Sequence, residues 1–286
     1  MLLQLFVSGL QAGAVYGLIG LGYATVLNAT GIVNFAQGDF LMVAALILAV
    51  LSTLQGLPYA LAVVLSLGLV SIIGAVSDYV LIRPLRRRHA SLFSMTMVMV
   101  GAMIVLEQGA ALIFGKRELP VNSPLPTSSI QLGAQTYVQP QGLLLLVVVV
   151  MTFIALYTFY HHTSLGKQMY AVGIDIEAAR AIGIDTLRAN AVAFALGGLV
   201  AGVGGVLFAP IVGASWQMGL PLTIKGFVAM VVGGAARLEG PLLGGAVLGL
   251  AEVFAYSWIS PAYGSALALI VLLVVLIVRP SGLLGT

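Results

Sequence analysis

Long uncharged apolar segments dominate this chain, and few folds accommodate them. Residues 1–38 contain no charged side chain, and residues 142–160 form another uncharged apolar run. About 20 consecutive apolar residues suffice for a helix to cross the hydrocarbon core of a membrane, and both segments reach about that length. Only 7% of all residues are charged, whereas about a quarter are charged in a typical soluble domain. The sequence therefore predicts an integral membrane protein.

Glycine and aliphatic residues fill the apolar segments without alternating with polar residues. A membrane β-barrel requires such alternation along its strands, so that fold is excluded. The 35 glycines instead favour helices whose backbones pack closely, and Gly9, Gly13 and Gly17 fall on one helix face. We predict an all-α fold, a polytopic transmembrane helical bundle with eight or nine membrane segments, some short or broken, in one domain over residues 1–286.

The predicted membrane segments follow one another at about 5–27, 36–54, 59–82, 92–114, 142–160, 189–216 and 222–236, with two more in 240–278. The segment at 222–236 is short for a crossing, so we expect it to be tilted or broken. We expect a break at Ser260-Pro261 to separate the last two segments. Residues 116–141 contain four prolines and few charges, which predicts a loop with irregular or short-strand structure outside the membrane.

The charge distribution predicts the orientation. Residues Arg83–His89 contain four arginines and no acid, and loops rich in arginine and lysine remain in the cytoplasm. Successive membrane spans run in opposite directions. With this loop in the cytoplasm, the N-terminus is expected outside the cytoplasm, and the loop at 161–188 and the C-terminus inside it. The basic residues thus serve as orientation signals, and no nucleic-acid partner is expected.

Several classes of site are excluded or disfavoured. The absence of cysteine excludes disulfides, thiolate metal sites and a cysteine nucleophile. His161 and His162 lie at the end of a span, where they suit the membrane interface better than a metal. Neither Gly115-Lys116 nor Gly166-Lys167 has the flanking residues of a phosphate-binding loop. We therefore expect no catalytic residue, no metal and no ATP site of this type in the chain.

A polar stretch, Asn28–Asp39, interrupts the first two apolar segments. Asn34 and Gln37 have the spacing of a capping box at a helix start, and Gly31 suits a left-handed turn that ends the preceding helix. We expect this junction near the cytoplasmic ends of both spans. A second interpretation, compatible with the first, is that polar side chains line a route for solute; these are Asn28, Asn34, Gln37 and Asp39.

Three acidic residues lie in or near apolar segments, namely Asp78, Glu107 and Glu252. Intramembrane carboxylates are costly when unpaired and therefore indicate function by default. Asp78 lies close enough to Arg83 to pair with it at the membrane edge. Glu107 and Glu252 suit the bundle interior, where either one protonates or pairs with Lys225. The further candidates for lining a route are Glu107, Gln108 and Glu252.

The loop at 161–188 contains a second informative segment. Asp175 suits the N-cap of a helix, Glu177 its first turn and Gly183 its end, which predicts an amphipathic helix of about two turns. Such a helix suits docking into a cleft of a partner. The alternative is an ordinary connecting helix that lies on the membrane surface.

Four motifs, taken in order, resemble those of the branched-chain amino acid ABC-transporter permease family, most closely the shorter of its two paired subunits. They are Asn28-Ala29-Thr30-Gly31 with Asn34-Phe35-Ala36-Gln37-Gly38; Glu177-Ala178-Ala179 with Gly183; Lys225-Gly226-Phe227 leading to Gly233-Gly234 and Gly240-Pro241-Leu242-Leu243-Gly244; and Arg279-Pro280-Ser281-Gly282-Leu283. The charged segment Ala235–Glu239 departs from the glycine-rich pattern expected there.

The resemblance implies a permease subunit of an ATP-binding-cassette importer in the bacterial inner membrane, for branched-chain amino acids or related small polar solutes. Its partners would be a second homologous permease, two ATP-binding subunits, a periplasmic solute-binding protein and membrane lipid. ATP would be bound by the partners, so the permease is no enzyme and needs no cofactor. The residues implied to couple it to the ATPase are Glu177, Ala178, Ala179, Arg180 and Gly183. The alternative is an ion-coupled secondary transporter that uses an intramembrane carboxylate.

Overall fold

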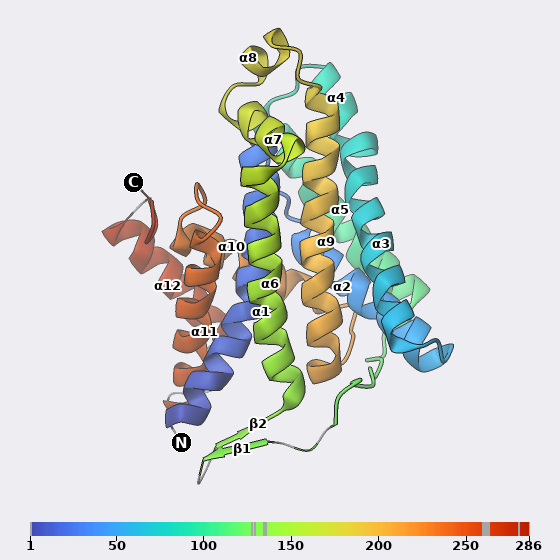
Figure 1. The fold of residues 1–286 in the computed structure, drawn as a ribbon, viewed down its shortest axis with the longest axis vertical. Helices are drawn as coiled ribbons and strands as arrows, with labels where there is room; N and C mark the ends of the chain where they lie inside the picture. Colours follow the sequence, from blue (N-terminus) through green and yellow to red (C-terminus); the bar gives the residue numbers. More distant parts are fainter. Residues whose placement is uncertain are drawn as a thin grey trace.

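The structure is a computed structural model that describes residues 2–126, 128, 130–133, 136–258, 264–279 and 281–285. Long helices run side by side along most of the molecule, with short helices at one end and a small hairpin at the other (Figure 1). The predicted break at Ser260-Pro261 lies outside the described residues.

The first half of the chain forms α1 (Leu2–Thr30), α2 (Gln37–Leu48) with the π-helical turn η1 (Ala49–Leu54), α3 (Tyr59–Ser77) with the π-helical turn η2 (Asp78–Ile82), α4 (Arg83–Arg87) and α5 (Leu92–Ile113). The second half forms α6 (Pro140–His162), α7 (Ser164–Ile174), α8 (Ile176–Ala181), α9 (Thr186–Val212), α10 (Gly219–Gly233), α11 (Gly240–Trp258) and α12 (Gly264–Val278).

Seven helical segments of the described residues are long and apolar enough to cross a membrane. They are Leu2–Thr30, Gln37–Leu54, Tyr59–Arg87, Leu92–Ile113, Pro140–His162, Thr186–Val212 and Gly240–Trp258. The shorter apolar helices Gly219–Gly233 and Ala268–Val278 add to these. The predicted polytopic helical bundle is confirmed. The segment predicted at 222–236 is also confirmed to be short, because it corresponds to Gly219–Gly233.

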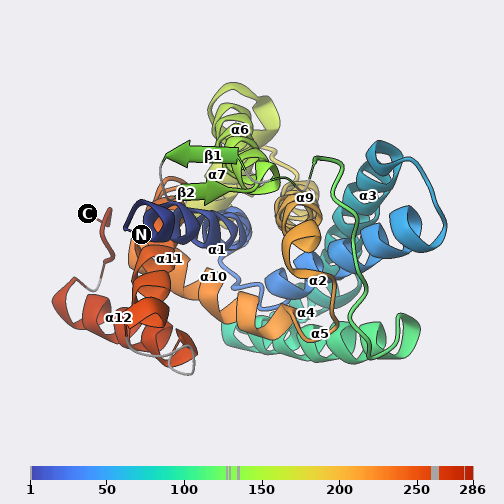
Figure 2. The ribbon, with the colours of Figure 1, turned by 90° about the horizontal axis from the view of Figure 1, so that it is seen from below.

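Helix α1 lies at the centre of the bundle and packs closely against α11 (Figures 1 and 2). The contact depends on glycine, because a Cβ atom at Gly13 would lie 2.5 Å from the carbonyl O of Gly245. At Gly9 an added Cβ would lie 2.9 Å from the Cα of Leu250. The predicted glycine face of this helix is therefore an interface at which two backbones approach closely.

The predicted loop at 116–141 contains the short strands β1 (Ile130–Gly133) and β2 (Thr136–Val138), which pair antiparallel. Its first part pairs with the connection between α9 and α10. The N–H of Leu119 donates to the carbonyl O of Ala214 at 2.8 Å, and the N–H of Ala214 donates back at 2.9 Å. This part of the loop is therefore anchored just after the C-terminal end of α9. The hairpin lies at the same end of the bundle (Figure 1).

The segment after α12 folds back onto the end of α10. The N–H of Leu283 donates to the carbonyl O of Val232 at 2.8 Å, and the N–H of Leu284 donates to that of Gly233 at 3.0 Å. The carbonyl groups in the last turn of a helix have no partner within it, so this segment supplies donors that α10 lacks. Gly282 and Gly234 permit the contact with φ angles of 81° and 103°.

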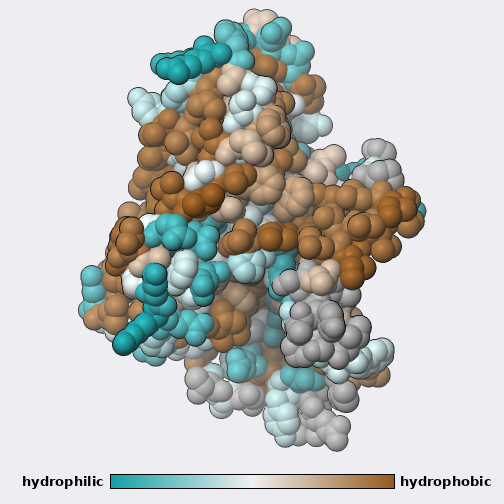
Figure 3. All heavy atoms as spheres, turned by 180° about the vertical axis from the view of Figure 1, so that it is seen from behind, coloured by the Kyte–Doolittle hydropathy of each residue, from teal (hydrophilic) through white to brown (hydrophobic). Residues whose placement is uncertain are grey.

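The face opposite to that of Figure 1 is mostly hydrophobic, with hydrophilic residues at its upper end and in patches lower down (Figure 3). Lipid tails leave no partner for polar groups, so the hydrophobic surface suits lipid or a membrane-embedded subunit.

Candidate functional site

The short helices α7 and α8 lie at the end of the bundle that also contains α4 (Figure 1). Oδ1 of Asp175 accepts hydrogen bonds from the N–H groups of Glu177 at 2.8 Å and Ala178 at 3.0 Å. Gly183 has a φ of 83°, which allows the turn after α8. The prediction of a short capped helix between these residues is confirmed. The preceding helix α7 was missed, and Thr163 caps it with a bond to the N–H of Gly166 at 3.0 Å.

Most side chains of α8 are available to a partner. Glu177, Ala178 and Arg180 are exposed, and Ile182 just after the helix is 75% exposed. Ala179 is only 2% exposed, so its methyl group faces this protein. Arg180 also donates from Nε to Oγ1 of Thr186 at 3.3 Å, which ties α8 to the start of α9. The predicted coupling residues thus divide into an exposed face and a packing residue.

Helix α7 joins α8 to the end of α1. A Cβ atom added at Gly173 would clash with the carbonyl O of Asn28, so the two backbones are in direct contact there. A displacement of α8 would therefore press on the last turn of α1, where the polar junction begins. Two packed backbones transmit such a displacement better than a pair of flexible side chains.

The junction after α1 is built differently from a capping box. Helix α1 ends at Thr30 and Gly31 has a φ of 71°, as predicted. Helix α2 begins only at Gln37, and its N-cap Ala36 makes no side-chain capping bond. Oδ1 of Asn34 accepts from the N–H of Ala36 at 3.2 Å, while Nδ2 of Asn34 donates to Oε1 of Gln37 at 3.1 Å. The capping-box prediction was wrong, because Asn34 lies three residues before the first helical residue and its side chain bonds to that of Gln37 and not to a backbone N–H of the helix.

The junction also reaches deeper than predicted. Nε2 of Gln37 donates to the carbonyl O of Gly197 at 2.6 Å and packs against Gly22. Gly22 precedes the end of α1 by eight residues, or about 12 Å at 1.5 Å per residue. The chain therefore turns back into the bundle before α2 begins. Asn34, Gln37 and Asp39 are fully buried in this conformation, and their role in lining a route stays a prediction.

Asp39 lies where the starts of two helices meet. It is in the first turn of α2, and Gly219, the first residue of α10, packs against its carboxylate. The N–H of Gly38 donates to Oγ1 of Thr223 on α10 at 3.1 Å. Neither carboxylate oxygen of Asp39 has a hydrogen-bond partner among the described residues. The positive ends of the dipoles of α2 and α10 stabilise a negative charge at this position.

Glu252 is paired inside the bundle. Its Oε1 lies 2.5 Å from Nζ of Lys225, which in turn donates to the hydroxyl of Tyr16 at 3.0 Å. The hydroxyl of Tyr256 donates to the same carboxylate oxygen. Of the two outcomes that the sequence left open for Glu252, pairing with Lys225 is thus confirmed. The cluster joins α1, α10 and α11, which gives Glu252 a role in packing.

Glu107 and Gln108 lie on α5, away from Glu252, because α10 lies between α5 and α11 (Figure 2). Glu107 is half-buried and Gln108 is exposed. Neither side chain has an ion pair or hydrogen bond in the described part of the chain. The structure therefore does not bring the two predicted acids, Glu107 and Glu252, into one site.

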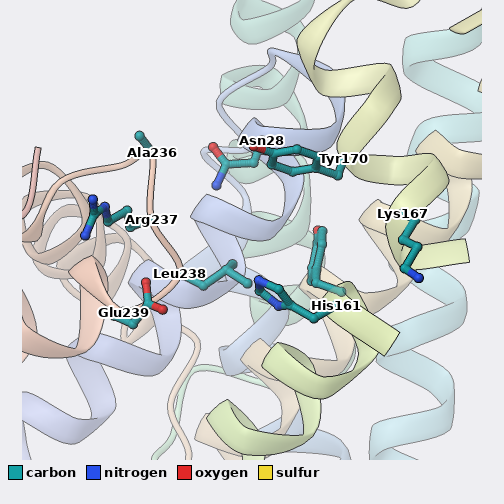
Figure 4. Close-up of a pocket in the computed structure, with 9 residues that line it drawn as sticks. Asn28, His161, Lys167, Tyr170, Ala236, Arg237, Leu238 and Glu239 are labelled. Atoms are coloured by element: carbon teal, nitrogen blue, oxygen red, sulfur yellow. The ribbon is translucent and has the colours of Figure 1, made fainter. Parts of the chain in front are cut away.

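A cavity of about 540 Å³ lies between the end of α1, the α6–α7 corner and the turn before α11 (Figure 4). His161 and Leu238 point toward each other in it with Asn28 above them, whereas Lys167 points away (Figure 4). It is lined by Asn28, Tyr160, His161, Lys167, Tyr170, Ala236, Arg237, Leu238 and Glu239. Sequence reasoning missed this cavity, because its residues come from separate parts of the chain. Asn28, a predicted route-lining residue, and the charged segment at 235–239 were its signals in the sequence.

Comparison with known proteins agrees with these features. Residues 5–276 match the family described as "Branched-chain amino acid transport system / permease component". The high-affinity branched-chain amino acid transport system permease protein LivH of Escherichia coli is 28% identical over 99% of this chain and 95% of its own length. The corresponding permease protein BraD of Pseudomonas aeruginosa is 31% identical, with the same coverage of both chains.

The fold resembles that of the solved structure of PsaBC from Streptococcus pneumoniae in complex with Fab, with a TM-score of 0.51. The sequences are 14% identical, and the likeness covers 96% of this chain and 91% of the other. The family match does not favour the ion-coupled transporter, and with seven apolar helices it indicates a multi-pass inner-membrane protein. This chain therefore belongs to the family of branched-chain amino acid transport system permease components.

Proposed function

We propose that this chain is the conduit of an ATP-driven importer that carries branched-chain amino acids or related small polar solutes. The observation that carries the proposal is the backbone contact between α7 and the end of α1, at Gly173 and Asn28. It connects an exposed, capped helix at one end of the bundle to the buried junction inside it. The names of LivH and BraD support the choice of solute.

The assembly that we propose contains a second, homologous permease, two ATP-binding subunits and a periplasmic solute-binding protein. The ATP-binding subunits hold the nucleotide, so this chain contributes neither a catalytic residue nor a cofactor. The N-terminus lies outside the cytoplasm and the C-terminus inside. The distribution of basic residues supports this orientation, with Lys116 and Arg117 outside and nine residues inside: Arg83, Arg86, Arg87, Arg88, Lys167, Arg180, Arg188, Arg237 and Arg279.

In this mechanism, closure of the ATPase dimer moves α8, and α7 transmits the movement to the end of α1. Ile32, Asn34 and Ala36 after α1 are fully buried, so this part of the junction moves as a unit with α2 and α9 through the bond from Gln37 to Gly197. The result is a change in the route between the two permeases. Each subunit therefore alternates between two packed arrangements and does not deform gradually.

Charge reversal on α8 tests the docking step. Glu177→Lys keeps an exposed, capped helix but reverses the charge presented to the ATPase. We expect it to abolish ATP-dependent uptake of labelled leucine while the permease is still inserted in the membrane. Glu118→Lys is the matched control, because Glu118 is exposed at the opposite end of the bundle. Normal uptake by the Glu177 variant would contradict the docking of α8.

The energy source separates an ATP-driven importer from an ion-coupled one. Uptake by the complete transporter should stop when ATP is depleted and continue when a protonophore removes the proton gradient at constant ATP. The opposite result would favour a carboxylate-coupled transporter.

A further inference from the structure

One outward-facing stripe runs along α3, η2 and α4, which form a continuous helical segment from Tyr59 to Arg87. Its exposed side chains are apolar for most of the length and end at a group of arginines. The apolar members are Leu61, Leu65, Leu69, Ile72, Val76 and Val80, each between 40% and 60% exposed. Helix α3 lies at the outer edge of the bundle, so this stripe faces away from the other helices (Figure 2).

The arginine end of the stripe is hollowed. A depression of about 360 Å³ is lined by Tyr79, Arg83, Pro84, Arg87 and Arg88. Tyr79 is 64% exposed, and the guanidinium carbon of Arg83 lies 5.0 Å from the centre of its ring. Tyrosine is enriched at the level of the lipid headgroups, where its ring is amphipathic.

Arg83 is held in place within this hollow. Its Nε donates to Oδ2 of Asp78 at 3.2 Å, and its Nη2 donates to the carbonyl O of Leu187 at 3.3 Å. The π-helical turn makes the first bond possible, because the N–H of Arg83 bonds to the carbonyl O of Asp78, five residues earlier. This pairing at the membrane edge agrees with the sequence prediction for Asp78.

The hollow keeps a positive charge. Three arginines and one aspartate give a net charge of +2, since Asp78 compensates only one of Arg83, Arg87 and Arg88. Arg87 and Arg88 are exposed and have no ion pair or side-chain hydrogen bond among the described residues. Guanidinium groups match the oxygen atoms of a phosphate in geometry as well as in charge.

We propose that this hollow binds the phosphate-bearing headgroup of an anionic phospholipid, with the acyl chains along the stripe from Val80 toward Leu61. A ligand that is acidic at one end and apolar along its length covers both parts of the surface. A protein with an acidic surface would cover the arginines and leave the stripe exposed, so the continuity of the two parts favours lipid. Basic pockets at the cytoplasmic side of membrane helices are known to bind such headgroups.

The test measures lipid binding by the purified permease with native mass spectrometry. The probes are phosphatidylglycerol and phosphatidylcholine with identical acyl chains, and inorganic phosphate as a competitor. The variant is Arg87→Gln with Arg88→Gln; both residues are exposed, so folding should be unaffected. The matched control is Lys116→Gln with Arg117→Gln, which removes the same charge from exposed positions just after α5, at the opposite end of the bundle. Thermal unfolding in detergent checks that both variants fold.

We expect the wild-type protein to retain phosphatidylglycerol over phosphatidylcholine, and the hollow variant to lose about tenfold or more in this preference. The control should keep it, and phosphatidylglycerol with six-carbon chains should bind less tightly than the long-chain lipid. Equal losses in both variants would overturn the proposal, because binding would then follow net charge alone. It would also be overturned if inorganic phosphate bound and no lipid did, or if the hollow variant kept the preference for phosphatidylglycerol.

Discussion

Lys225 on α10 and Glu252 on α11 form an ion pair with 2.5 Å between Nζ and Oε1, although the side chain of Glu252 is only 1% exposed. Removing one partner of a buried ion pair leaves an uncompensated charge and typically costs about 3–5 kcal/mol. We therefore expect Glu252→Gln to lower the unfolding temperature of the permease in detergent. Lys225→Met combined with Glu252→Leu should recover most of the loss. Equal stability of Glu252→Gln and wild type would show that the pair does not hold α10 to α11.

The contact between α1 and α11 predicts a difference between two glycine substitutions. Gly13→Ala places a methyl group against the backbone of Gly245, and such overpacking costs about 1–3 kcal/mol. Gly68→Ala is the matched control, because Gly68 lies on the exposed stripe of α3 with no atom near an added Cβ. The control should be neutral or slightly stabilising, since alanine is the better helix former by about 1 kcal/mol. Thermal unfolding of both variants measures the difference, which should vanish if α1 and α11 do not pack closely.

The hydrogen bond from Asn34 to Gln37 in the junction after α1 leads us to predict that Gln37 stabilises the folded protein. Gln37→Ala leaves Nδ2 of Asn34 buried without its acceptor, and an unsatisfied buried group costs about 1–3 kcal/mol. Gln55→Ala is the control, because Gln55 is exposed at the end of η1. We expect a lower unfolding temperature for the first variant alone. If the two variants are equally stable, the bonds of Gln37 are not structural.

The backbone bonds between the segment after α12 and the end of α10 lead us to predict how fast amide hydrogens exchange in the last turn of α10. Leu283→Pro removes the N–H group that donates to Val232, whereas Leu283→Ala keeps it. We expect faster hydrogen exchange in the last turn of α10 in the proline variant and unchanged exchange in the alanine variant. Similar exchange in both variants would mean that the apolar side chain, and not the backbone bond, secures the end of α10.

The helices were largely predictable from sequence, because their lengths follow from the thickness of the membrane. The segments predicted at 59–82 and 92–114 correspond closely to Tyr59–Ile82 and Leu92–Ile113. The short helix after Asp175 was also predictable, since one capping side chain and one glycine determine where it starts and ends. These are local properties, and they require no knowledge of the neighbouring helices.

The features that sequence reasoning missed depend on contacts between distant residues. The depth of the junction is determined by the bond from Gln37 to Gly197, which no local pattern encodes. The same bond explains why the capping box failed, because the amide of Gln37 is used for tertiary packing. The cavity near Asn28 and His161 is likewise formed by the arrangement of separate elements. Spacing alone cannot predict such arrangements.

The bonds from Leu283 and Leu284 to the end of α10 have a consequence for biosynthesis. Residues 232 and 233 leave the ribosome well before residues 283 and 284, so α10 enters the membrane with its last carbonyl groups unpaired. Translation of the later residues supplies the missing donors. The final hydrogen bonding of α10 is therefore coupled to completion of the segment that follows α12.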